Sequence, residues 1–358
     1  MIGIPGFSRR WRLTWASLGC TALVLTGMVL DPYRELLDFR LILFLWVTAG
    51  LSGLLILTMD RLTTAPWLRP FETVARTLAD SLPASSILLF AVLVGGQLTG
   101  PARVQPAGFW TWWHSPVFLL ARSAVYLSCW VLLTRVPLAG FRLSKGTVHR
   151  IGRGWAGLIL GLIAATFWLA SADWVMALSS GWPTTLSMVY SFSSLLVTAA
   201  PLLGLAVVTS LPRIDILAGH RGTTFIHDIG RFLLLTSSFW MGAWSCRYLL
   251  VAYSALPAQP PDGQLPTEGP WSGIFFLVPL LNWFVPCAIL LSRRVPIDSR
   301  SLWQISILVM IGRWFDLYQI MLAEHGAFTL THFLFDLAPT MLLVLLWIAR
   351  GGSSRNRA

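Results

Sequence analysis

The residues of this chain with the clearest chemical potential are ionisable side chains inside long apolar stretches. Arg313 and Asp316 lie three residues apart in the run from Leu302 to Leu322, so a helix would place them on one face. A charge at the centre of a bilayer costs about 2.5–3.5 kcal/mol on insertion scales, so such residues need partners inside the protein. We consider them, with the other ionisable candidates, for a proton path or a site near a quinone headgroup. The full candidate set is Arg122, Asp173, His227, Asp228, Arg247, Arg313, Asp316 and Asp336.

The composition identifies the class of protein that must hold these charges. Hydrophobic residues make up 56% of the chain, charged residues only 11%, and the mean hydropathy is +0.70. These values exclude an ordinary soluble domain. The net charge of +11 is spread over short loops rather than gathered in one patch, which argues against a nucleic-acid-binding protein. The chain is therefore predicted to be an all-α integral membrane protein with a single polytopic membrane domain over residues 1–358.

About ten apolar runs approach the length of some 20 residues that a membrane-spanning helix needs. The third run is the shortest, and Pro83 on one side and Gly100 on the other bracket it. The predicted spans are Leu13–Leu30, Leu41–Met59, Ser85–Leu98, Val117–Thr134, Gly154–Ala172, Leu186–Ser210, Ile229–Ala252, Trp271–Leu291, Leu302–Leu322 and Leu330–Ala349.

The distribution of basic residues predicts the orientation of these spans. With ten crossings, 20 of the 26 Lys and Arg residues fall in the termini and loops at one side of the membrane, and three fall at the other. Because basic loops stay in the cytoplasm, both termini are predicted to be cytoplasmic. On the same side, apolar residues recur at helical spacing from Pro70 to Leu82, with charges between them. This segment is predicted to be a cytoplasmic helix lying in the membrane interface.

Position along each span converts into depth at about 1.5 Å per residue. Arg313 is then roughly 16 Å and Asp316 roughly 21 Å from the cytoplasmic side. Six charges fall between the midplane and the outer face: Arg122, Asp173, Arg247, Arg313, Asp316 and Asp336. One interpretation is a polar site that opens outward, for a quinone headgroup or a proton path. The other is a set of internal ion pairs that fix helix packing, and both stay open. His227 and Asp228 are either an inner proton mouth or a solvated helix end.

Motifs for a redox cofactor held by this chain are missing from the sequence. Cys20, Cys129, Cys246 and Cys287 are scattered over four spans, without the spacing of an iron–sulfur site or of c-type haem attachment. The six His residues fall in loops or at span ends, whereas b-type haem needs axial ligands on facing helices inside the bilayer. No catalytic residues, no cofactor site and no metal site are therefore predicted in this chain.

Four blocks, in order along the chain, carry a family resemblance. The run from Asp173 to Leu178 reads Asp-Trp-Val-Met-Ala-Leu, and Gly-Trp-Pro-Thr-Thr-Leu follows from Gly181. The pair resembles the Asp-Trp-x-Met-Ser-Leu…His-Trp-Phe-Ser-Thr signature of the ActF-type membrane subunits of alternative complex III, the quinol:cytochrome c oxidoreductase. These subunits belong to the NrfD-like superfamily of polysulfide-reductase membrane subunits. The other matching blocks are Ser115–Tyr126, His227–Leu234 with Phe239-Trp240 and Tyr253–Pro257, and Arg313–Tyr318.

The resemblance implies a fold and a set of partners. It implies two four-helix bundles flanked by single helices, in a respiratory or photosynthetic complex of the bacterial inner membrane. The implied partners are a multihaem cytochrome c, a periplasmic iron–sulfur subunit and a paralogous membrane subunit that oxidises quinol, menaquinol or ubiquinol. Haem c and iron–sulfur clusters would belong to these partners. Gly181 stands where the family has a His, which removes one titratable group from the outer mouth.

The expected function is thus a haem-free membrane subunit of an alternative-complex-III-type quinol:electron-acceptor oxidoreductase, which supports assembly and proton translocation. Two alternatives come from other classes of protein. One is a secondary transporter with a charged intramembrane site, although the charges lie outward of the midplane and few Gly- or Pro-broken helices flank them. The other is a purely structural scaffold subunit.

Overall fold

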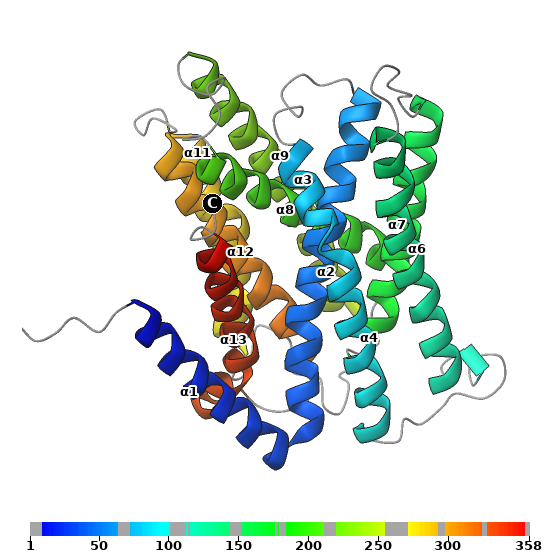
Figure 1. Ribbon diagram of the computed structural model, residues 1–358, viewed down its shortest axis with the longest axis vertical. Coiled ribbons are helices and arrows are strands. Elements are labelled where there is room, and N and C mark those ends of the chain that lie inside the picture. The colour runs from blue at the N-terminus through cyan, green and yellow to red at the C-terminus, as the bar shows by residue number, and fades with distance from the viewer. Residues whose placement is uncertain are drawn as a thin grey trace, which may run out of the picture.

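The computed structural model describes residues 9–63, 72–100, 112–113, 115–142, 152–175, 178, 184–210, 220–254, 271–292, 298–323 and 328–354. The elements in this part of the chain are helices, so the predicted all-α membrane class is confirmed (Figure 1). They are α1 (Arg9–Leu30), α2 (Pro32–Thr63), α3 (Glu72–Ala79), α4 (Leu82–Thr99), α6 (Pro116–Arg142), α7 (Arg153–Trp174), α8 (Thr184–Ser210), α9 (His220–Ser254), α10 (Ser272–Pro279), the π-helical turn η5 (Leu280–Phe284), α11 (Val285–Leu290), α12 (Ser299–Leu322) and α13 (Leu330–Ser354).

Length and apolar composition mark most of these helices as membrane-spanning. Among the described residues, seven helical stretches are long and apolar enough to cross a bilayer, and Trp15–Leu30 and Leu330–Leu345 are shorter apolar helices. The short predicted span Ser85–Leu98 lies within α4, which has Pro83 in its first turn, where a proline is tolerated, and ends before Gly100. The protein is therefore a multi-pass membrane protein.

The helices form two four-helix groups with a flanking pair. The first bundle consists of α2, α4, α6 and α7, with α3 packed on α2. The second consists of α8, α9, the α10–η5–α11 segment and α12. The long helix α2 also contacts α8 and α12, so it joins the two bundles, and α1 and α13 pack on each other and on α2 (Figure 1). This is the arrangement that the family resemblance implies.

Helix α2 begins at Pro32 rather than at Leu41, where the predicted second span begins. Asp31 precedes it, and the Asp31 carboxylate accepts a hydrogen bond from the backbone N–H of Arg34 at 3.0 Å. This cap, followed by a proline at the first helical position, is a strong helix start. As a consequence, Arg34 and Arg40 lie inside the helix instead of in a connecting loop.

The predicted interfacial segment Pro70–Leu82 contains α3, and its first two residues lie outside the described part of the chain. Ala75 and Ala79 of α3 are fully buried against α2. Gly53 of α2 makes this possible, because a Cβ at that position would collide with the Ala75 carbonyl. One face of α3 is thus held by protein, and its position in a membrane interface stays a prediction.

The second bundle is interrupted by the π-helical turn η5, which Pro279 precedes and Pro286 follows. Asn282 of this turn is fully buried, and its amide donates to the Val278 carbonyl at 2.9 Å. Gly312 of α12 lies directly opposite, where a Cβ would come 2.7 Å from the Asn282 amide nitrogen. The close approach of α12 to η5 places Arg313 beside this irregular turn.

Candidate functional site

Three clusters of buried charged and tyrosine side chains lie at the end of the bundles where α2 begins. The helix directions bring them there, because α6, α8 and α13 begin at this end while α7 and α12 finish there. We name each cluster after its aspartate. The Asp173 cluster is Arg40, Arg122, Tyr126 and Asp173; the Asp316 cluster is Tyr190, Arg247, Arg313 and Asp316; the Asp336 cluster is Arg34, Glu35, Asp38, Tyr318 and Asp336.

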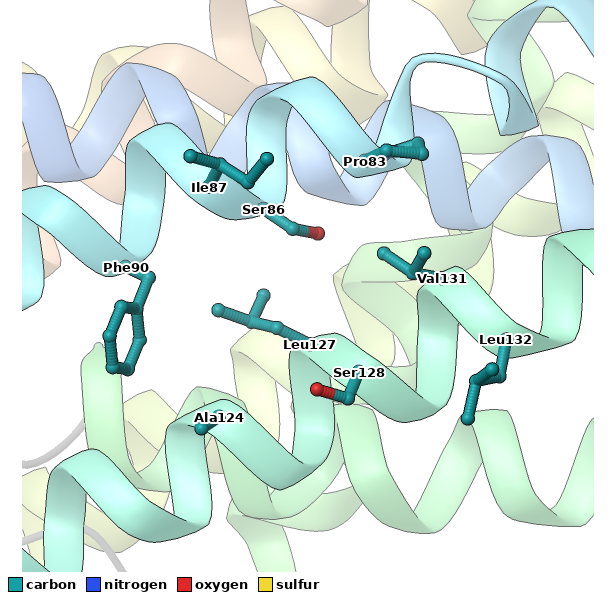
Figure 2. Close-up of a pocket in the computed structure, with 9 residues that line it drawn as sticks. All are labelled: Pro83, Ser86, Ile87, Phe90, Ala124, Leu127, Ser128, Val131 and Leu132. Carbon is teal, nitrogen blue, oxygen red and sulfur yellow. The ribbon is translucent and has the colours of Figure 1, made fainter.

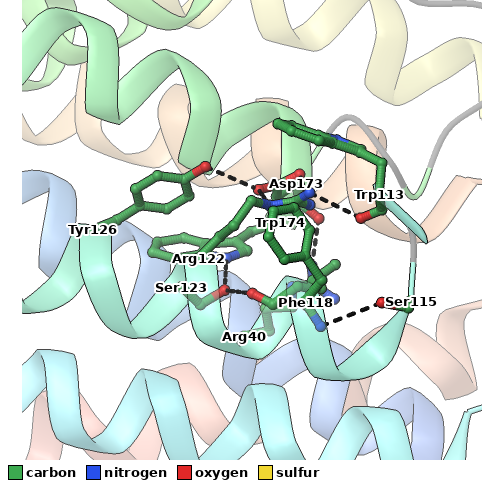
Figure 3. Close-up of polar contacts among 10 residues, drawn as sticks. Arg40, Trp113, Ser115, Phe118, Arg122, Ser123, Tyr126, Asp173 and Trp174 are labelled. Atoms are coloured by element: carbon green, nitrogen blue, oxygen red, sulfur yellow. Dashed lines mark hydrogen bonds and ion pairs between the residues drawn. The ribbon is translucent and has the colours of Figure 1, made fainter. Parts of the chain in front are cut away.

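The Asp173 cluster is built on a bidentate ion pair between α6 and α7. Arg122 donates from Nη2 to Asp173 Oδ1 at 2.7 Å and from Nε to Asp173 Oδ2 at 3.1 Å (Figure 3). The Tyr126 hydroxyl donates to the same carboxylate at 3.4 Å. From α2, Arg40 donates to the Asp173 backbone carbonyl at 3.2 Å. The carboxylate is therefore held ionised by donors from neighbouring helices.

Aromatic side chains lie close to the Arg122 guanidinium. Its third nitrogen, Nη1, donates to the Trp113 carbonyl at 2.8 Å (Figure 3). The guanidinium carbon lies 4.1 Å from the ring centre of Trp113 and 4.8 Å from that of Phe118. Below it, the Trp174 indole donates to Ser123 at 2.8 Å. Arg122 is only 7% exposed, so this pair is shielded from solvent.

The Asp316 cluster lies in the second bundle. Arg313 and Asp316 form an ion pair on one face of α12, with 2% and 1% of each residue exposed. The Tyr190 hydroxyl of α8 donates to the other Asp316 oxygen. From α9, the Arg247 guanidinium lies 5.9 Å from the Tyr190 ring centre, within cation–π range. Three helices thus contribute to the surroundings of one carboxylate.

The Asp336 cluster joins α2, α12 and α13. Arg34 donates from Nε to Asp336 Oδ1 at 2.9 Å and from Nη2 to Oδ2 at 2.8 Å, a second bidentate pair. The Tyr318 hydroxyl donates to Asp336 Oδ2 at 2.7 Å. Glu35 and Asp38, one and four residues after Arg34, are 3% and 2% exposed. This cluster holds more acidic than basic groups.

Polar atoms without a hydrogen-bond partner follow the inside of the second bundle. Buried polar groups in proteins nearly always have a partner, and internal water supplies it where side chains do not. Within the described residues, side chains from α8, α9, η5 and α12 each contribute such an atom, and on α12 they extend over about 10 Å, from Ser306 to Arg313. They are Ser191, Ser194, Ser237, Trp240, Asn282 (Oδ1), Ser306 and Arg313 (Nε).

The structure brings together some of the predicted site residues and separates others. Arg122 meets Asp173, Arg313 meets Asp316, and Arg247 reaches the latter pair through Tyr190. Asp336 joins neither pair, since its partner is Arg34.

His227 and Asp228 lie near the beginning of α9, about 28 Å along the helix from Arg247, at the opposite end of the bundle. His227 is exposed, and Asp228 contacts the exposed Arg231 at 3.8 Å. Gly181, the predicted departure at the outer mouth, lies outside the described residues.

Sequence reasoning missed the charged residues at the beginning of α2. The predicted second span begins at Leu41, which leaves four charged residues in the preceding loop: Arg34, Glu35, Asp38 and Arg40. The Asp31-Pro32 pair was the available signal, because it is typical of a helix start and would have extended the span toward these charges. The tyrosines at positions 126, 190 and 318 gave no such signal, since each contacts a carboxylate from a different helix.

A separate apolar pocket of about 500 Å³ lies between α4 and α6 (Figure 2). Its lining includes the exposed side chains of Ile87 and Leu132, and the hydroxyls of Ser86 and Ser128 supply its polar atoms. No titratable side chain lines it. The buried ionisable side chains of the three clusters therefore lie apart from this pocket.

Comparison with known proteins adds no relative to these observations. No protein-family model matches the chain, and no curated protein matches it.

Proposed function

We propose that this chain is a haem-free membrane subunit of an alternative-complex-III-type quinol:electron-acceptor oxidoreductase, and that its second bundle conducts protons to the Asp316 cluster. The proposal rests on one observation: residues from separate sequence blocks that carry the family resemblance contact each other in the structure. Arg122 and Asp173 come from two blocks on the consecutive helices α6 and α7, 51 residues apart, and they form one bidentate pair. A third block supplies Arg313 and Asp316 of the neighbouring bundle.

The proton role is supported by the polar atoms inside the second bundle. A chain of water molecules needs polar contacts along its length, and serine hydroxyls at positions 194, 237 and 306 provide them. Where these polar atoms end, the Tyr190 hydroxyl donates a hydrogen bond to Asp316, and the hydroxyl proton can exchange. Protons would move along water and hydroxyl groups to the Asp316 carboxylate, whose charge Arg313 balances at rest.

Partners with redox centres belong to the same proposal. In it, a multihaem cytochrome c, an iron–sulfur subunit and a paralogous quinol-oxidising membrane subunit carry the electron transfer. This chain supports their assembly and couples the reaction to proton movement. The site residues of the proposal are Arg122, Asp173, Arg247, Arg313 and Asp316, at the end of the bundles where the two ion pairs lie.

The assembly half of the proposal is tested by purification from the native membrane in mild detergent. We expect the chain to bring down proteins with the absorbance of c-type haem, in a fixed ratio. Recovery of the chain alone, with no haem absorbance, would contradict the complex.

The proton half is tested in the isolated complex with Asp316→Asn, which keeps the shape and removes the charge. We expect fewer protons translocated per electron with the subunits still assembled. Asp80→Asn is the control, because it removes the same charge from an exposed side chain between α3 and α4, outside the second bundle. An unchanged ratio in Asp316→Asn, together with lower stability, would assign the pair to helix packing and favour a scaffold subunit.

A further inference from the structure

The Asp38 carboxyl lacks the partners that a buried carboxylate requires. Only 2% of Asp38 is exposed, and within the described chain neither of its side-chain oxygens accepts a hydrogen bond. Glu35, one turn away on α2, is 3% exposed, and its Oε1 is also without a donor. An ionised carboxylate with no donor in a buried site is very costly, and such a group takes up a proton instead.

Asp336 has the opposite surroundings. Both of its oxygens accept from Arg34, and Oδ2 also accepts from the Tyr318 hydroxyl at 2.7 Å. These charge-assisted bonds stabilise Asp336 as an anion. Asp38 lies one helical turn after Arg34, so its carboxyl is on the face of α2 that meets Asp336. Two carboxyl groups on this face can bond to each other only when one of them carries a proton, since carboxylates have acceptors alone.

The charge balance of the cluster leads to the same protonation. Arg34, Glu35 and Asp38 come from α2, Tyr318 from α12 and Asp336 from α13. Helix α1 covers Glu35 through Gly27, which brings no charge. Three carboxyl groups with one guanidinium would hold two excess negative charges in an interior where a single unbalanced charge already costs several kcal/mol. Protons are the neutralising ions that the geometry accommodates.

We propose that Asp38 and Asp336 form a proton-binding carboxyl pair, in which Asp38 carries the proton and donates it in a hydrogen bond to Asp336. Arg34 and Tyr318 hold the accepting carboxylate in place. The Arg34 side chain, 12% exposed, marks the edge of the cluster nearest the surface, so the pair exchanges its proton at the end of the bundle where α2 begins. This inference does not depend on the electron-transport assignment.

Infrared spectroscopy of the purified chain at neutral pH tests the pair. Protonated carboxyl groups have a C=O stretching band apart from that of carboxylates, and it shifts in heavy water. We expect this band in the wild-type protein and the loss of one carboxyl equivalent in Asp38→Asn. In Asp336→Asn the band also falls by one equivalent, because Arg34 is then free to pair with Asp38 and to ionise it. Loss of the same equivalent in either single variant is the signature of a shared proton.

Two controls make the measurement decisive. Asp173→Asn removes a carboxylate held ionised by Arg122, so the band should keep its wild-type intensity. Glu35→Gln reports the separate contribution of Glu35 to the band. A wild-type spectrum with no protonated-carboxyl band would overturn the proposed carboxyl pair, and so would an unchanged band in Asp38→Asn. Neither measurement requires a partner subunit. Failure of the complex to co-purify would contradict only the proposed function.

Discussion

The ion pair between α6 and α7 provides a quantitative test of how this bundle is held together. Removing one partner of a buried pair leaves the other charge without compensation and typically costs about 3–5 kcal/mol. The loss of stability in Asp173→Leu should be near the lower limit of this range, because Arg122 keeps its bond to the Trp113 carbonyl and its stacking on two rings. The loss in Arg122→Met should be near the upper limit, because Asp173 then loses both bonds from the guanidinium, while its hydrogen bond from Tyr126 is long at 3.4 Å.

The double variant separates the pair from its surroundings. With both charges removed, no buried charge is left uncompensated, so Arg122→Met with Asp173→Leu should cost less than about 2 kcal/mol. The coupling energy between the two sites is then about 6 kcal/mol or more. The assay is reversible unfolding in mixed micelles, followed by the tryptophan fluorescence of the chain, to which the buried Trp174 beside both residues contributes. A double variant whose loss of stability equals the sum of the two single losses would refute the reasoning.

Two further predictions concern α12. Gly312→Ala should lower the free energy of unfolding by about 1–3 kcal/mol, because the new Cβ would meet the Asn282 side chain, whereas Gly242→Ala, with open space around it, should be neutral or slightly stabilising in the same assay. The hydrogen bonds from Ser301 hold the pKa of Asp298, the cap of α12, below its ordinary value of 3.8. Because the pKa is lowered in the folded state, the cap stabilises α12 above that ordinary value and loses this effect as the pH falls through the folded-state pKa. The protection factors of the first-turn amides, which correct exchange rates for the intrinsic effect of pH, should therefore fall at acid pH in the wild type. In Asp298→Ala they should already be low at neutral pH, and an equal dependence on acid in both proteins would exclude the cap.

Much of the fold could be predicted from apolar runs alone. Each predicted span falls within or along a helical segment of the structure, because a stretch of about 20 apolar residues has few ways to satisfy its backbone in a bilayer other than an α-helix. The beginning of α2 was missed for the same reason. A window that seeks apolar residues ends where Arg34, Glu35 and Asp38 begin, although the Asp31-Pro32 cap continues the helix through them.

The candidate site was predictable only where partners share a helix. Arg313 and Asp316 are three residues apart, so helical geometry alone predicts their pairing. By contrast, 302 residues separate Arg34 from Asp336, and hydropathy carries no information about which distant charges meet. The proposed path is a further example, since serines at membrane depth are common and only packing shows which hydroxyls lack a partner.

By itself, the sequence determined that this protein is a helical bundle in a membrane, and that ionisable side chains lie inside it. Composition and periodicity suffice for both conclusions, because the bilayer imposes the same backbone constraint on every span. Only the tertiary structure decided which of those charges pair with one another. It paired Arg122 with Asp173 across two helices and Arg34 with Asp336, and among the described residues it left the buried Asp38 without a hydrogen-bond donor. Partner choice depends on which helix faces meet, and that is a property of the packed bundle rather than of any single span.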